Sequence, residues 1–134
     1  MIQEVKEQIY NILTSDLGYL VVDNPQDNTN NTFPCLLLTT SKITRDKVKN
    51  TYQHKVSFKI DVFSTYHGEK EILEIDQQIY DTLQEKIYDN ELVTYFRQTD
   101  FKVLDDNSVG VVMKHGIINY TVYLSGMEAE TESE

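Results

Sequence analysis

Two stretches of the chain repeat apolar residues at the spacing of an α-helix. In residues 2–13 the repeat comprises Ile2, Val5, Ile9, Ile12 and Leu13. In residues 69–88 it comprises Ile72, Ile75, Ile79 and Leu83, widened by Leu73, Tyr80 and Ile87. Residues three and four apart share one side of a helix, so each stretch predicts an amphipathic helix with one buried stripe.

The clearest strand is predicted at residues 55–63, where apolar and polar residues alternate. Val56, Phe58, Ile60 and Val62 fall on one face, and Lys55, Ser57, Lys59 and Asp61 on the other. This period of two is typical of a sheet with one buried face.

Four other stretches are expected to form strands. Residues 19–22 form a short apolar run, and the nearly continuous apolar run 33–39 indicates a strand buried on both faces. Residues 95–104 and 111–124 surround the turn-forming sequence Asp105 to Ser108, which predicts an antiparallel hairpin. Gly116, inside the last strand, is expected to mark a bulge or kink.

The resulting order of elements is α-β-β-β-α-β-β. It predicts an α+β fold, in which a mostly antiparallel sheet is covered on one face by two helices. We expect a single domain over residues 1–126. Residues 127–134 contain four Glu and no base, so they are expected to form an acidic disordered tail.

Two polar segments separate these elements. Residues 23–32 are rich in Asn and other turn formers, and we expect a long loop that is mobile in the free protein. Residues 41–50 contain four bases, Lys42, Arg45, Lys47 and Lys49. Two interpretations of this second segment stay open: an exposed connection between strands, or a basic arm that contacts an acidic neighbouring subunit or nearby nucleic acid.

Composition narrows the possible functions. The 134 residues carry 12 bases and 22 acids, for a formal net charge of −10. Nucleic-acid binders usually carry a basic surplus, because neutralising phosphates supplies their affinity. No stretch approaches the ~20 apolar residues of a membrane span, and the first residues lack a signal-peptide pattern. These features predict a cytosolic protein.

The sequence carries no recognisable catalytic signature. Nucleotide-binding glycine motifs and the GxSxG motif of esterases are absent. The histidines His54, His67 and His115 do not share a metal-ligand spacing. Cys35 lies inside the apolar run, where a thiol is usually an inert hydrophobe. We therefore expect no catalytic residue, no metal and no cofactor.

Aromatic and basic residues supply the candidate interface. The chain has nine Tyr and no Trp, and Tyr is favoured where one end of a side chain is buried and the other is wet. Phe63 stands on the nominally polar face of its strand. The predicted protein-interface residues are Lys42, Arg45, Lys47, Lys49, Tyr52, Phe63 and Tyr66.

The order of elements resembles the tail terminator family of long-tailed bacteriophages, also called tail completion or minor tail proteins. The resemblance rests on the Phe-Pro-led strand at residues 33–38, on the phrase His54–Ser64 ending in Val-Phe-Ser, and on the turn at Gly68 before a helix. It extends over roughly residues 2–124.

This resemblance implies a structural virion protein without a catalytic site. Members form a ring, commonly a hexamer, that caps the head-proximal end of the tail tube and stops its polymerisation. The implied partners are further copies of the chain, the major tail tube protein and the head connector. DNA passes through the lumen without sequence-specific binding, and assembly takes place in the host cytoplasm.

Three other functions remain open at this stage. The chain could be a head–tail joining or head-closure protein of the neck, which would bind the portal assembly of the head instead of the tube. It could be a cytosolic module that binds a small molecule. It could also be a small enzyme with a site assembled from His54, His67, His115 and Cys35.

Overall fold

The computed structural model describes residues 2–24, 32–48, 51–65, 68–106 and 113–127. Helix α1 (Ile2–Asn11) continues into a π-helical turn (Ile12–Asp16), followed by the short strand β1 (Leu20–Val22). Strands β2 (Cys35–Val48) and β3 (Thr51–Ser64) precede helix α2 (Lys70–Lys86) and a 3-10 turn (Ile87–Asp89). Strands β4 (Val93–Asp106) and β5 (Met113–Met127) complete the domain.

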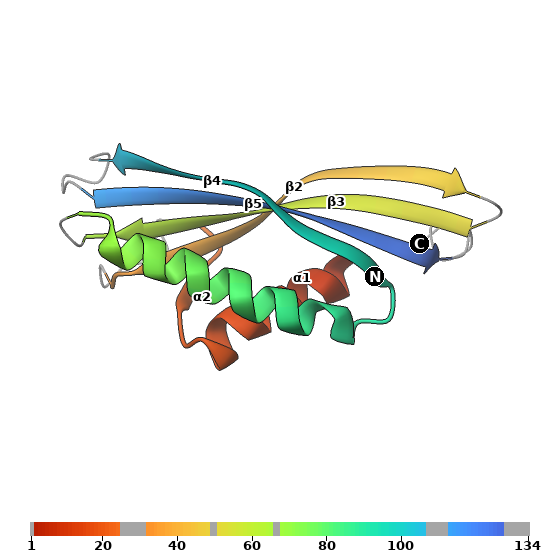
Figure 1. Ribbon diagram of the computed structural model, residues 1–134, viewed down its shortest axis with the longest axis horizontal. Coiled ribbons are helices and arrows are strands. Elements are labelled where there is room, and N and C mark those ends of the chain that lie inside the picture. The colour runs from red at the N-terminus through yellow and green to blue at the C-terminus, as the bar shows by residue number, and fades with distance from the viewer. Residues whose placement is uncertain (1, 25–31, 49–50, 66–67, 107–112, 128–134) are drawn as a thin grey trace.

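The five strands form one sheet in the order β1-β2-β3-β5-β4. Strand β1 pairs with β2 in parallel, and the other three pairings are antiparallel. Both helices lie on the same side of this long, twisted sheet (Figure 1). The predicted α+β fold and its order of elements are therefore confirmed.

The core lies between the helices and the face of the sheet toward them. Val56, Phe58, Ile60 and Val62 of β3 are all fully buried, as the alternation predicts. Helix α2 buries the predicted stripe against this face, and α1 adds Val5 and Ile9. The opposite face, which carries Lys55, Lys59 and Phe63, has no helix among the described residues, and we call it the helix-free face.

Residues 41–48 of the basic segment are part of a strand and not an exposed connection between strands. Strand β2 continues to Val48, and its residues from Lys42 onward pair with Thr51–Ser57 of β3. The register shifts between Thr40 and Lys42, which leaves Ser41 as the extra residue of a bulge. The Ser41 hydroxyl donates to the Ser57 carbonyl at 3.0 Å. Backbone pairing along a hairpin does not require an apolar face, so hydrophobic alternation does not reveal this part of the strand.

Gly116 does not mark a bulge or kink, because β5 stays in register through it with both neighbours, Val62 and Val103. Its role is to allow α2 to approach the sheet closely. A Cβ at position 116 would lie 2.8 Å from Cδ1 of the fully buried Ile72 and 3.0 Å from Cε1 of Phe101. Only a residue without a side chain leaves room for both neighbours.

A small polar cluster lies beneath α2. The Gln98 amide donates to Asp76 at 3.2 Å, and the hydroxyl of Tyr120 is buried without a hydrogen-bond partner in the described part of the chain. Burial raises the pKa of Asp76 above its ordinary 3.8, against the smaller lowering effect of the Gln98 bond. Burial, with the charge of Asp76 nearby, also raises the pKa of Tyr120.

We expect Gly116→Ala to destabilise the fold by about 1–3 kcal/mol, because the added methyl overpacks a close-packed site. Denaturant unfolding measures this change. Ile72→Val removes the Cδ1 atom nearest to the new methyl, so the double variant should lose less stability than the two single changes summed. Strict additivity would show that the contact with Ile72 is not the cause.

We expect Asp76→Asn to raise the melting temperature at neutral pH. A carboxyl whose pKa is raised by folding binds its proton more tightly in the native state, so wild-type stability falls as pH rises from 3.8 through the raised value. The gain of the variant should therefore disappear below pH 3.8. Glu74→Gln, on the exposed side of the same helix, is the matched control, and an equal gain there would contradict the explanation.

Candidate assembly interface

The basic segment forms half of a projecting arm, which we define as residues 41–48 of β2 and 51–57 of β3. Figure 1 shows the far end of this hairpin extending past both helices. Lys42, Arg45 and Lys47 are all exposed on it. Lys49 lies outside the described residues. Residues 41–48 thus form a strand with exposed bases, and its contact with an acidic neighbouring subunit or with nucleic acid stays a prediction.

The predicted aromatic residues do not gather at one place. The backbone of Tyr52 pairs with Lys47 inside the arm. Phe63 lies eleven residues further along β3, a separation of about 36 Å in an extended strand. Tyr66 lies outside the described residues. The two predicted aromatic residues that the structure describes therefore lie near opposite ends of β3.

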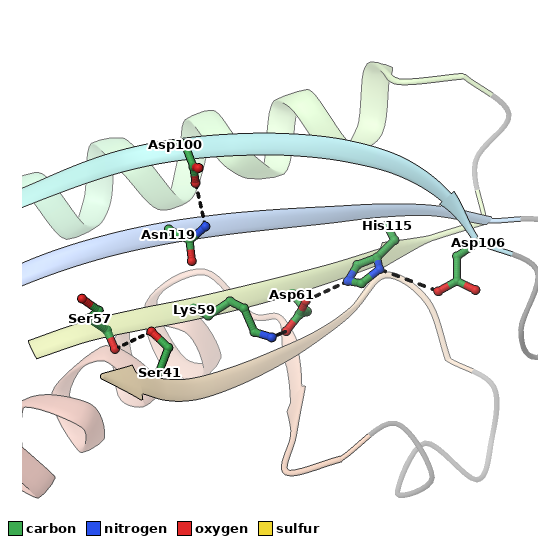
Figure 2. A network of polar contacts seen from close by, with 8 residues as sticks. All are labelled: Ser41, Ser57, Lys59, Asp61, Asp100, Asp106, His115 and Asn119. Carbon is green, nitrogen blue, oxygen red and sulfur yellow. Dashed lines mark hydrogen bonds and ion pairs between the residues drawn. The ribbon is translucent and has the colours of Figure 1, made fainter. Parts of the chain in front are cut away.

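Phe63 belongs to a compact polar and aromatic cluster on the helix-free face. Its ring stacks on His115 with a centroid separation of 4.4 Å and an interplanar angle of 20°. His115 Nε2 lies 2.7 Å from Asp61 Oδ1, and its Nδ1 lies 3.7 Å from Asp106 Oδ2 (Figure 2). Lys59 Nζ approaches the other oxygen of Asp61 at 3.7 Å. Phe63 therefore has a partner within its own chain.

Asp61 is buried although it stands on a face without a helix. Only 5% of its side chain is exposed, whereas 39% of Lys59 and 18% of His115 are exposed. Lys59 of β3 and His115 of β5 are the two side chains that contact its carboxylate. The alternation of residues 55–63 places Asp61 on the polar face, but the pairing of Phe63 with His115 is needed to bring the imidazole to it.

A groove of about 310 Å³ occupies another part of the helix-free face. Tyr95 and Tyr123 face each other across β4 and β5, with ring centroids 5.2 Å apart. The cations Lys55 of β3 and Arg97 of β4 form no ion pair with any residue that the structure describes. The groove is lined by Lys55, Tyr95, Arg97, Thr99, Thr121 and Tyr123. No local pattern in the sequence reveals this groove, because its lining residues come from three strands and meet only through the register in which those strands pair.

Charge is divided between the two layers of the domain. Residues 2–17 and 69–91, which contain both helices, carry eleven carboxylates and three lysines. The four long strands carry five carboxylates and eight bases. The protein therefore presents an acidic helical layer and a mildly basic sheet. Contacts between different surfaces of two copies can be selected by such a difference in charge.

The residues considered for chemistry do not meet. Cys35 is buried, and burial raises the pKa of its thiol, which disfavours the reactive thiolate. His54 is buried in β3, where it pairs with Leu124, whereas His115 pairs with Phe63 on the opposite face and near the other end of β3. His67 is outside the described residues. No group of three metal-binding side chains occurs within the described ranges. The described helices include none that is long and apolar enough to cross a membrane.

Comparison with known proteins decides the family. The sequence model of the family "tail completion protein gp17" matches residues 11–125. This match begins at Asn11, the last residue of α1, and ends inside β5. It includes the arm and Phe63. The chain belongs to this tail completion family. It is a structural protein of the bacteriophage virion, located in the tail.

A solved structure has the same fold. A chain from the virion of a native gene transfer agent particle superposes with a TM-score of 0.55 at 13% sequence identity. The alignment covers 92% of the tail completion chain and 94% of the virion chain. At this identity the likeness concerns the fold. No match to a curated protein was found.

We expect His115→Ala to lower the free energy of unfolding by about 3 kcal/mol, because it leaves the buried Asp61 carboxylate without its nearest partner and removes the stack on Phe63. Denaturant unfolding measures the loss. Adding Asp61→Leu should restore part of it, since the double variant no longer buries a poorly compensated charge. A double variant less stable than His115→Ala would contradict this account.

Proposed function

We propose that the chain closes the head-proximal end of the phage tail tube as a ring of six copies. In this role it stops tube polymerisation and forms the joint to the head, and DNA passes through the lumen without sequence-specific binding. Its membership of the tail completion family over residues 11–125 carries the proposal. Its partners are further copies of itself, the major tail tube protein and the head connector.

The shape and charge of the domain fit this role. A ring requires two different surfaces on each copy that meet by a rotation that closes. The arm carries exposed bases, whereas other surfaces of the domain, among them β4 and the helical layer, carry more acids than bases. The formal net charge of −10 disfavours tight binding of DNA, because like charges repel.

The arm supplies the contact that we assign to the predicted residues. Lys42, Arg45 and Lys47 are exposed on the β2 half of the arm. The far end of the arm extends past the helices, so these cations can reach an acidic neighbouring subunit (Figure 1). Tyr52 belongs to the arm, whereas Phe63 lies near the opposite end of β3; the assignment of Lys49 and Tyr66 to the interface stays a prediction from the sequence. In this proposal the basic side chains contribute mainly to the rate and specificity of assembly, as charged rims commonly do.

The experiment adds the purified chain to tail tube protein during polymerisation and measures tube length by electron microscopy. We expect the wild type to halt elongation and to be found at one tube end. The variant Lys42→Glu/Arg45→Glu/Lys47→Glu should require a concentration about tenfold higher, equivalent to about 1.4 kcal/mol. The control Lys6→Glu/Lys70→Glu reverses charge on the helical layer outside the arm and should act like wild type.

Two outcomes would overturn parts of this proposal. Tubes that elongate normally with excess wild type, together with binding of the chain to the portal assembly of the head, would favour a head–tail joining protein. An arm variant that caps tubes as efficiently as wild type would exclude the arm as the contact and leave the capping function in place.

A further inference from the structure

The sheet has two open edges in the part of the chain that the structure describes. Strand β1 pairs only with Cys35–Leu37, so residues 38–48 of β2 have a neighbouring strand on one side alone. At the other end of the sheet order, β4 pairs only with β5. An edge strand presents a row of backbone N–H and C=O groups that can pair with another strand.

The directions of the strands make these two edges complementary. Strand β2 is antiparallel to β3, β3 to β5 and β5 to β4, so β4 runs opposite to β2. A second copy, rotated about an axis along the strands, would therefore place its β2 antiparallel beside β4. Both strands contain 14 residues, so the sheet can continue from copy to copy without a change in pattern.

Charge distinguishes this pairing from its alternatives. The open part of β2 carries three bases, Lys42, Arg45 and Lys47, and one acid, Asp46. Two such edges placed together would bring like charges close, which destabilises cross-strand pairs. Strand β4 carries three acids and two bases: Asp100, Asp105, Asp106, Arg97 and Lys102. A β2 edge is therefore better matched to a β4 edge than to another β2 edge.

We propose that residues 38–48 of β2 pair in antiparallel fashion with β4 of a second copy, so that the ring is one continuous sheet. The inference rests on the proposed ring and adds the backbone surface that builds it. Six copies with four long strands each would join about 24 strands, and closed barrels of roughly 16 or more strands leave an aqueous channel. The helix-free face, with Lys55 and Arg97, lines this channel, and the helices lie outside.

The test uses cross-linking between two strand positions. Thr44 of β2 pairs with Lys55, and Lys102 of β4 pairs with Ile117, so both belong to the helix-free face. Cys35→Ser removes the native thiol, and Thr44→Cys and Lys102→Cys are introduced singly and together. A series of flexible bis-maleimides of increasing length, the shortest spanning two or three residue steps along a strand, allows for different registers of the two strands. Reactions are run over a concentration series and on capped tail tubes, and analysed under denaturing conditions.

The proposal predicts a specific pattern of products. The doubly substituted chain should give a ladder of covalent oligomers that ends at the closed ring. Mixing the two single variants should give dimers, whereas each single variant alone should remain monomeric. The matched control, Thr44→Cys with Gln77→Cys on the exposed side of α2, should give no ladder, because the helices lie on the other face.

Three results would overturn the edge pairing. Dimers from Thr44→Cys alone would show that β2 pairs with β2, and a ladder from the α2 control would show that the sheet of one copy packs on the helices of the next. Absence of cross-links on tubes that are nevertheless capped would reject the continuous sheet while the capping function stands. If the chain does not cap tubes but the ladder forms, the proposed function fails and the edge pairing survives.

Discussion

Strands β3 and β5 pair in antiparallel register at the centre of the sheet, and most other features of the structure follow from this pairing. It aligns Ile60 with Ile118 and Phe58 with Tyr120, which completes the face that α2 covers. It equally places Phe63 beside His115 on the helix-free face. A shift by one residue would move every one of these side chains to the wrong side of the sheet. The buried apolar set therefore specifies the polar surface as well.

The strands extend beyond the part of the sheet that the two helices cover (Figure 1). Helix α2 approaches the sheet closely at Gly116, where Ile72 takes the space that a side chain would fill. Beyond the helices, β2 and β3 continue as the far end of the arm, with β5 paired beside β3 as far as Tyr52. Strand length in excess of the core leaves backbone edges and charged side chains available for contacts with other molecules. In the proposed ring, such surfaces are the means of assembly.

The helix-free face combines fixed and open features. At one end, Asp61, His115 and Phe63 satisfy one another, which holds the ends of β3 and β5 together. Elsewhere on it, Lys55 and Arg97 flank a tyrosine-lined groove. The first group stabilises the domain, whereas the second leaves cations exposed over an otherwise acidic protein. The division of charge between the helical layer and the sheet gives each copy two chemically different surfaces.

The sequence by itself determined the elements, their order and the α+β class, because periods of 3.6 and two directly report which side chains are buried. It also located the basic segment and Phe63. It did not show that residues 41–48 are a strand, since a hairpin held by backbone hydrogen bonds needs no apolar alternation. It misassigned Gly116, whose constraint comes from Ile72, 44 positions away. Only the tertiary structure joined Asp61 to His115 and Tyr95 to Tyr123, because cross-strand neighbours depend on register, which local patterns do not encode.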